Sequence, residues 1–380
     1  MTRRIFIVAA ESSGDVLGAD LVGALRARSP DVALAGVGGP ALESRGLKSA
    51  FDIKSLAILG LIDGVKAYPR VVRLADKAAD AAVAFAPDTV VLIDSWGFTL
   101  RVAQRLRKRL PGLKLVKYIG PQVWASRPGR AKTLARTVDH LICIHDFELP
   151  FYTPFNLPCT VCGHPALGRY VQGDGGAFRA RHGLGDAPLL LVLPGSRGSE
   201  LRRTAPRLFA AAGRLCADIP SLKVVVVAAR SIATGARAMA SAQSYPVLVV
   251  DEAGEKEDAF AAGTAALAVS GTVTTEVGLQ GTPVVVGYRL GWITWALARL
   301  FLYKSPFMTL MNVAAAREIA PEFIQTRCTA EILARAAAPL LRDPAARSAQ
   351  VDAQDRALKA MGRGGRPAAD IAAEAVLAIR

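Results

Sequence analysis

The sequence predicts an α/β fold with two Rossmann-like, doubly wound domains that face each other across a cleft. Short β-branched runs alternate with amphipathic segments, the pattern of parallel sheets covered by helices on both faces. A glycine-rich pause at 163–185 separates two such series. The chain has 380 residues, 52% of them hydrophobic and 21% charged, which is enough for two cores.

The first series predicts an N-terminal domain over residues 1–170. Its apolar runs predict buried strands, and amphipathic stretches at 17–28 and 100–110 predict helices between them. The expected strands are Ile5–Ala10, Val32–Val37, Thr89–Asp94, Leu115–Ile119 and Leu141–Ile144.

The second series predicts a C-terminal domain over residues 171–355. From Ala330 onward the pattern is helical only, and we expect the helices at 356–380 to rejoin the first domain. The expected strands are Leu189–Leu193, Val224–Ala228, Val247–Val250, Ala265–Val269 and Pro283–Val286, with a helix at 203–217.

Composition indicates a location and a class of ligand. Five cysteines do not form an even disulfide framework, so a reduced cytoplasmic setting is expected. The first apolar run stops at Glu11 and the stretch 290–303 contains Arg299, so neither export nor a membrane span is expected. The net charge of +15 attracts phosphate, on a nucleotide or on an anionic membrane. No nucleic-acid-binding motif is present, so we expect no nucleic-acid partner.

The end of the first strand is the first candidate site. Glu11 is followed by Ser13, Gly14 and Asp15 at the start of a helix. These residues are equally consistent with a helix cap and with a ligand site at the sheet edge. The glycine pattern of a dinucleotide site is absent, which argues against a dehydrogenase.

Asp94 ends the third strand and is the candidate general base. In a dry cleft a carboxylate at this position could take a proton from a hydroxyl nucleophile. The alternative is a helix N-cap.

The second domain carries the candidate nucleotide site. Gly195, Ser196 and Arg197 form a turn between a strand and a helix, where backbone N–H groups and a guanidinium can bind an anion. A similar turn follows the strand at 265–269. Further candidate ligands there and beyond the last strand are Ser270, Gly271, Thr272, Glu276, Tyr288 and Arg289. Glu276 could bind two ribose hydroxyls.

Metal chemistry has little support in the sequence. Cys159, Cys162 and His164 form an incomplete ligand set, and no D-x-D pair is present to hold a metal on a sugar nucleotide. We therefore expect no metal and no cofactor, with arginine and helix dipoles taking up charge on a leaving diphosphate.

Two features suggest contact with an anionic membrane. The stretch 101–136 contains 11 lysines and arginines and no acid. The stretch 277–317, also without an acid, mixes aromatic, apolar and basic residues, and 56–62 is a second apolar loop. Packing in the core explains the apolar stretches equally well.

Together the motifs resemble the lipid-A-disaccharide synthase family over nearly the whole chain, in order. The matching segments are Glu11–Asp15, Gly36–Pro40, Ile93–Asp94, Pro121–Ala125, Gly163–Pro165, Leu193–Arg197, Ser270–Thr272 and Gly287–Arg289, with Asn312 and Arg317–Glu318. The family pattern differs at Ala10, Trp96–Gly97, Gly120, Gln122, Ser126, Met311 and Ala316, mostly on the expected acceptor side.

The resemblance implies a GT-B type inverting glycosyltransferase that needs no metal. The donor would be UDP-2,3-diacylglucosamine and the acceptor 2,3-diacylglucosamine 1-phosphate. Asp94 would be the base and Glu11 the second catalytic candidate. Glu11 and Ser13 would line the acceptor and donor cleft, and Asn312 and Arg317 would close the site. Arg197, Thr272, Glu276 and Arg289 would hold UDP.

The resemblance also implies a peripheral position on the inner membrane and allows a homodimer. The alternatives are a diverged paralogue with another acceptor, a UDP-sugar epimerase of the same fold, and a non-catalytic membrane-associated binding protein.

Overall fold

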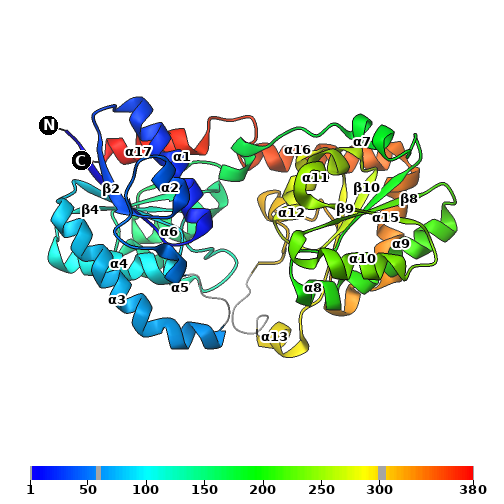
Figure 1. Ribbon diagram of the computed structural model, residues 1–380, viewed down its shortest axis with the longest axis horizontal. Helices are drawn as coiled ribbons and strands as arrows, with labels where there is room; N and C mark the ends of the chain where they lie inside the picture. The colour runs from blue at the N-terminus through cyan, green and yellow to red at the C-terminus, as the bar shows by residue number, and fades with distance from the viewer. Residues whose placement is uncertain (1, 57–60, 298–304, 380) are drawn as a thin grey trace. The chain divides into compact units, whose positions relative to one another are not determined.

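The computed structural model describes residues 2–56, 61–297 and 305–379, which divide into two compact units (Figure 1). The first unit comprises Met1–Gly168 and Gly364–Arg380, and the second comprises Arg169–Arg363. The sequence places the corresponding divisions at 170/171 and at 356. Residues 356–363 belong with the second unit because they complete and cap the helix Pro344–Ala360, and Ala357, Leu358 and the cap residue Met361 are buried.

A parallel six-stranded sheet forms the centre of the first unit. The strand order is β2-β1-β3-β4-β5-β6, so the chain reverses its direction of travel between β1 and β3. The strands are β1 (Arg4–Ala9), β2 (Ala33–Val37), β3 (Thr89–Ile93), β4 (Lys114–Tyr118), β5 (His140–Cys143) and β6 (Cys159–Val161).

Helices cover both faces of this sheet. One face packs against α3 and α4, and the other against α1 and α17. The last helix lies beside the first one (Figure 1), where Arg28 forms a 2.9 Å ion pair with Asp370. The helices are α1 (Ser12–Arg28), α2 (Pro40–Ser44), α3 (Leu61–Phe85), α4 (Trp96–Arg109), α5 (Gly129–Ala135), α6 (Leu149–Tyr152) and α17 (Ala368–Ala378).

The second unit repeats the plan with its own parallel sheet. The order β12-β11-β10-β7-β8-β9 reverses between β7 and β10. The strands are β7 (Leu189–Leu193), β8 (Lys223–Ala228), β9 (Val247–Asp251), β10 (Ala265–Ala268), β11 (Val284–Tyr288) and β12 (Glu322–Ile324).

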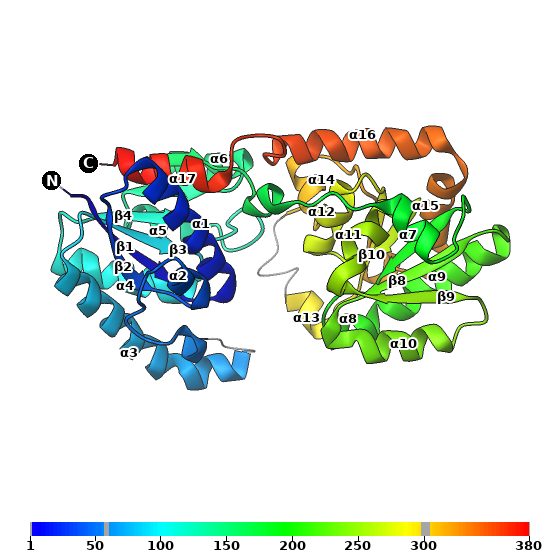
Figure 2. The same ribbon diagram turned by 45° about the horizontal axis from the view of Figure 1, so that its top comes forward.

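In the described part of the second unit, ten α-helices surround the sheet. Among them α16 lies along α12 and α14 (Figure 2), and its buried Gln354 donates to the carbonyl of Thr282 and accepts from the amide of Val284. The helices are α7 (Gly175–Arg181), α8 (Gly198–Arg203), α9 (Ala205–Asp218), α10 (Ala233–Ser241), α11 (Glu252–Ala262), α12 (Thr272–Leu279), α13 (Trp292–Leu297), α14 (Leu310–Ala314), α15 (Ala330–Arg342) and α16 (Pro344–Ala360).

Short 3₁₀ helices complete the two units. They are η1 (Ile53–Leu56), η2 (Asp146–Glu148), η3 (Thr153–Phe155), η4 (Pro165–Arg169), η5 (Arg230–Ile232) and η7 (Gln325–Arg327).

The predicted α/β class with two doubly wound sheets is confirmed. All ten expected strands are present, with bounds that differ slightly at the ends. The sequence missed β6 and β12, because each has three residues and lies at a sheet edge, where no long apolar run is needed.

No helix in the described ranges is both long enough and apolar enough to cross a bilayer. Much of the apolar material expected at a membrane surface, residues 57–60 and 298–304, lies outside the described residues.

Candidate functional site

The candidate residues of the first unit lie where its strand order reverses. Glu11 follows β1 and Asp94 follows β3, and these strands are neighbours, with Ala9 beside Ile93. Ligands of open α/β sheets bind at this position, outside the carboxyl ends of the strands. Glu11 and Ser13 are exposed there, and Gly14 is buried against Ile93.

Asp94 lies in a backbone turn of unusual conformation. Asp94 and Ser95 both have left-handed φ angles, 44° and 41°. The Asp94 amide donates to the carbonyl of Tyr118 over 2.9 Å, and its carbonyl accepts from the hydroxyl of Thr99 over 2.8 Å. The side chain of Asp94 is half-buried. The turn therefore presents a carboxyl group at the sheet edge on a firmly held backbone.

A buried lysine lies beside this turn. Lys117 on β4 is 3% exposed and donates to the carbonyl of Asp94 and to the hydroxyl of Thr99. Burial lowers the pKa of its ammonium to about 7, although the charges of Asp94 and Glu11 act in the opposite direction. In the sequence Lys117 stands out only as part of the basic stretch 101–136. Its position inside an apolar strand was the signal that could have identified it.

Asp15, a predicted ligand residue, stabilises the backbone of the first unit. Its buried carboxylate accepts from the amides of Gly39 (2.7 Å), Ala41 (2.8 Å) and Leu42 (3.1 Å). These bonds fix the start of α2, whose first amides have no partner within the helix. Asp15 therefore shapes the loop after β2.

The second unit contains a pocket of about 380 Å³ at its own strand reversal. Its walls follow the carboxyl ends of β7, β8 and β10. The structure brings seven predicted residues together here, from two separate strand-to-helix turns: Gly195, Ser196, Arg197, Ser270, Gly271, Thr272 and Glu276.

A carboxylate that the sequence analysis did not identify closes the first turn. The buried Glu200 accepts at Oε2 from the amides of Ser196 (3.0 Å) and Arg197 (3.2 Å). Gly195 has a φ of 95°, and a Cβ there would lie 2.2 Å from Glu200 Oε2, so glycine is required. The expectation that these two amides bind an anion is wrong for this conformation, because Glu200 occupies them. The glutamate three residues after the cap, as in a capping box, was the available signal.

The side chains of this pocket can still bind an anion. The Arg197 side chain is 75% exposed, with its guanidinium 3.5 Å from Glu200 Oε1. On the opposite wall Thr272 begins α12, and Glu276 forms a 2.9 Å ion pair with Lys256. Lys256 was not predicted, and it adds a second basic group to the pocket.

Four other predicted ligands, Tyr288, Arg289, Asn312 and Arg317, are not among the residues that line this pocket. Tyr288 is nearly buried at the end of β11 and interacts with Glu200 and Arg197, while burial raises the pKa of its phenol. The amide of Arg289 donates to Thr204 over 3.1 Å, and Arg317 is exposed after α14.

Asn312 is fully buried. Its amide group bonds to Ile319, Ala320 and Glu322 at 2.7–2.9 Å, so it fixes the 308–322 loop.

The cysteines of the first unit do not form a metal centre. Within the described ranges no group of three or more histidine, cysteine and acidic side chains is placed to hold a metal ion. Burial raises the pKa of the Cys159 thiol to about 11 and that of Cys162 to about 12, which keeps both protonated near neutral pH.

The basic stretch 101–136 is partly neutralised, contrary to the expectation that it faces phosphate as a whole. Acids elsewhere in the sequence pair with three of its arginines, and Lys117 is buried. The pairs are Arg105–Asp76, Arg107–Asp139 and Arg109–Asp80.

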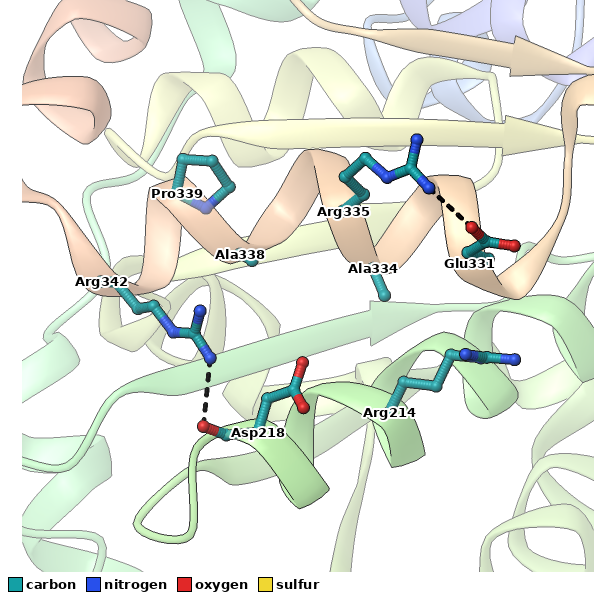
Figure 3. A pocket seen from close by; sticks show the side chains of 8 residues that line it. All are labelled: Arg214, Asp218, Glu331, Ala334, Arg335, Ala338, Pro339 and Arg342. Atoms are coloured by element: carbon teal, nitrogen blue, oxygen red, sulfur yellow. Dashed lines mark hydrogen bonds and ion pairs between the residues drawn. The ribbon is translucent and has the colours of Figure 1, made fainter.

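A second cavity, of about 500 Å³, lies between α9 and α15 (Figure 3). Arg342 donates to the carbonyl of Asp218 over 3.1 Å, and Arg335 pairs with Glu331 at 2.6 Å. The helices and not the strand ends form this groove, and none of the predicted site residues lines it.

Comparisons with known proteins agree with this arrangement. The family described as "Lipid-A-disaccharide synthetase" matches residues 5–376. A lipid-A-disaccharide synthase from Rhodospirillum centenum is 42% identical over 379 residues, covering 98% of this chain and 94% of the relative.

Solved structures share the fold at low sequence identity. A putative UDP-N-acetylglucosamine 2-epimerase from Listeria monocytogenes has a TM-score of 0.64 at 16% identity, covering 99% of this chain and 95% of that one. The UDP-GlcNAc 2-epimerase from Neisseria meningitidis, solved with UDP-GlcNAc, has a TM-score of 0.62 at 11% identity, covering 99% and 100%. The fold is therefore that of the GT-B glycosyltransferases and epimerases, and by its nearly full-length match the chain belongs to the lipid-A-disaccharide synthase family.

Proposed function

We propose that this protein transfers 2,3-diacylglucosamine from its UDP derivative to 2,3-diacylglucosamine 1-phosphate. The acceptor 6-hydroxyl oxygen attacks C1 of the donor sugar, and the bond from C1 to the diphosphate breaks. The hydroxyl proton passes to a carboxylate, and UDP leaves with the bonding electron pair. The product is the β-1,6-linked tetraacyl disaccharide 1-phosphate, with the anomeric configuration inverted.

The pocket at the carboxyl ends of β7 and β10 is the observation that carries this proposal. It combines a largely exposed arginine, two hydroxyl-bearing turns and a carboxylate, as a nucleoside diphosphate requires. We place the diphosphate against the Arg197 guanidinium and the Ser196, Ser270 and Thr272 hydroxyls. Glu276 would then bind the ribose hydroxyls, with Lys256 holding its carboxylate.

Asp94 is the general base in this proposal. It stands half-buried at the strand reversal of the first unit, on a backbone held by Tyr118 and Thr99. Glu11 and Ser13 lie exposed at the neighbouring strand end, where an acceptor sugar could contact them. The roles of Arg289 and Arg317 in binding UDP or closing the site stay predictions.

The test is mass spectrometry of the products formed by purified protein from both lipid substrates. The parent protein should form the tetraacyl disaccharide 1-phosphate and UDP. Asp94→Asn should form neither and should still bind UDP in a calorimeter, because the nucleotide pocket belongs to the second unit. Equal transfer rates in the two proteins would remove Asp94 from the mechanism.

The same assay separates the alternative activities. UDP release from the donor alone, without a disaccharide, would indicate a hydrolase, and an isomerised UDP-sugar would indicate an epimerase. No turnover together with UDP binding would indicate a binding protein. A product with another acceptor would indicate a diverged paralogue.

We also propose a peripheral position on an anionic membrane. Tyr68 is 53% exposed, with the Arg101 guanidinium 5.0 Å from its ring centre, and Trp292 is 58% exposed. An aromatic ring beside a cation suits the lipid interface. Binding to vesicles that contain phosphatidylglycerol should weaken steeply with salt, because the field is screened. Vesicle binding that is insensitive to salt would contradict an electrostatic contribution to membrane binding. Cross-linking would test for a homodimer.

A further inference from the structure

A buried cation lies directly beside the candidate base. Lys117 on β4 pairs with Leu92 on β3. Leu92 precedes Asp94 by two residues in the sequence. Its ammonium group donates to the carbonyl oxygen of Asp94 and to Thr99 Oγ1, the latter over 2.8 Å. The Thr99 hydroxyl bonds the same carbonyl over 2.8 Å. Two side chains from two elements therefore hold one backbone oxygen.

The turn that they hold needs restraint. Successive left-handed residues that are not glycine are costly and persist only where surrounding structure enforces them. A strained backbone at a strand end that carries a candidate catalytic carboxylate is a recognised sign of function. Lys117 and Thr99 supply the restraint on the side of the Asp94 carbonyl.

Apolar packing does not explain why a lysine occupies this buried position. Lys117 lines a small cavity with uncharged residues: Leu92, Trp96, Thr99, Leu100, Ala103, Leu134 and Val138. The charged groups that act on it are Asp94 after β3 and Glu11 after β1. Burying an ammonium in such a wall is unfavourable, and burial lowers its pKa to about 7. A methionine would pack there at lower cost.

We propose that Lys117 is a positioning residue for the transfer reaction: it fixes the Asp94 turn, and its positive charge supports the ionised Asp94 carboxylate. This inference rests on the proposed role of Asp94 as the base. Lys117 acts through Asp94 and does not itself need to touch a substrate.

Four variants test the inference, each measured for kcat, KM and the pH profile of kcat. Lys117→Met removes both the bond and the charge, and Lys117→Gln keeps a donor without the charge. Thr99→Val removes the other bond to the carbonyl and leaves the charge. Lys114→Met is the matched control, because it removes a lysine from the amino end of the same strand, away from the turn.

In Lys117→Met we expect kcat to fall about 100-fold, the effect of a small misplacement of a reacting group, with little change in the KM for the donor. The acidic limb of its kcat profile should move to higher pH, because the candidate base loses a nearby positive charge. Lys117→Gln should show the same shift with a smaller loss of kcat. Thr99→Val should lower kcat without moving the limb, and Lys114→Met should match the parent protein.

An acidic limb that stays in place in both Lys117 variants would overturn the inference, since a purely structural lysine would lower kcat alone. Should Lys117→Met fail to fold, the Lys117→Gln profile decides. Asp94→Asn is assayed in parallel. If Asp94→Asn is inactive and the acidic limb of the Lys117 variants does not move, only the role of Lys117 is rejected. If it is active, the proposed base is rejected first.

Discussion

Oε2 of Glu200 lies 3.0 Å from the amide nitrogen of Ser196, so a buried carboxylate closes the turn that the sequence presents as an anion site. The same oxygen lies 3.2 Å from the amide nitrogen of Arg197. The other carboxylate oxygen of Glu200 lies 3.5 Å from the largely exposed Arg197 guanidinium. The affinity of the pocket for a diphosphate must then come mainly from side chains.

Removing the Glu200 carboxylate should loosen this turn. In Glu200→Ala the amides of Ser196 and Arg197 lose their acceptor, and we expect the free energy of unfolding to fall by about 2 kcal/mol. UDP binding should weaken with it, because Arg197 is no longer held. Glu200→Gln, which keeps an oxygen acceptor, should retain most of the stability.

Urea unfolding and calorimetry with UDP measure both effects. Glu331→Ala, on the exposed side of α15 (Figure 3), is the matched control. Unchanged stability and UDP affinity in Glu200→Ala would show that the turn does not depend on this carboxylate.

Arg197 should control nucleotide affinity without contributing to the fold. Its side chain is 75% exposed, so Arg197→Ala should leave the thermal midpoint unchanged. Loss of a charge-assisted bond to phosphate should weaken UDP binding about 10- to 100-fold. Calorimetry makes the comparison, and Arg335→Ala in the groove between α9 and α15 is the control. Parent-like UDP affinity in Arg197→Ala would place the diphosphate elsewhere.

Asp15 should matter for stability rather than for ligand binding. Asp15→Ala leaves the amides of Gly39, Ala41 and Leu42 without their acceptor, and we expect a loss of about 3 kcal/mol. UDP binding, which we propose for the pocket of the second unit, should not change. Glu43→Ala, an exposed acid of α2, should show no loss. Denaturant unfolding is the measurement, and an unaltered midpoint in Asp15→Ala would contradict this role.

Lys117 should make stability depend on pH in a defined window. Its pKa is about 7 in the folded protein and 10.5 as the ordinary value, so between these pH values the unfolded chain binds the extra proton. Folding then releases a proton, and the contribution of Lys117 to the free energy of unfolding rises by about 1.4 kcal/mol per pH unit. Below pH 7 both states are charged and the slope vanishes.

The measurement compares urea unfolding of the parent protein and Lys117→Met from pH 6 to 10. The difference between the two curves isolates the lysine from other titrating groups. As the pH rises above about 7, we expect the free energy of unfolding of the parent protein to increase relative to that of Lys117→Met. Parallel curves over the whole range would mean that Lys117 keeps an ordinary pKa.

The strands were predictable because burial on both faces leaves a continuous apolar run, and Leu189–Leu193 is one example. The pocket turns were predictable because Gly195 and Gly271 stand between an apolar run and a helix. Glu200 was not identified, since a glutamate at the third helical position is common and its target depends on how the turn folds. Lys117 could not be distinguished by charge from the other lysines and arginines of the same basic stretch.

The ion-pair partners of the basic residues in 101–136 could not be predicted from that segment alone. Arg105, Arg107 and Arg109 form an unbalanced cluster in the sequence, yet Asp76, Asp139 and Asp80 lie beside them in the fold. Charge counts along a window include only local neighbours. The pairing depends on which elements pack against α4: Asp76 and Asp80 come from α3, and Asp139 immediately precedes β5.

The sequence by itself determined the two strand-helix series, the α/β class and the motifs of the family, because apolar periodicity and turn residues act over a few neighbouring positions. The tertiary structure alone decided which motifs meet. The strand orders place Glu11 near Asp94 in one unit and Ser196 near Thr272 in the other, and they direct Asp15 and Asn312 inward. The physical reason is that a hydrogen bond or ion pair needs two groups within about 3–4 Å, and chain positions far apart reach that distance only through packing.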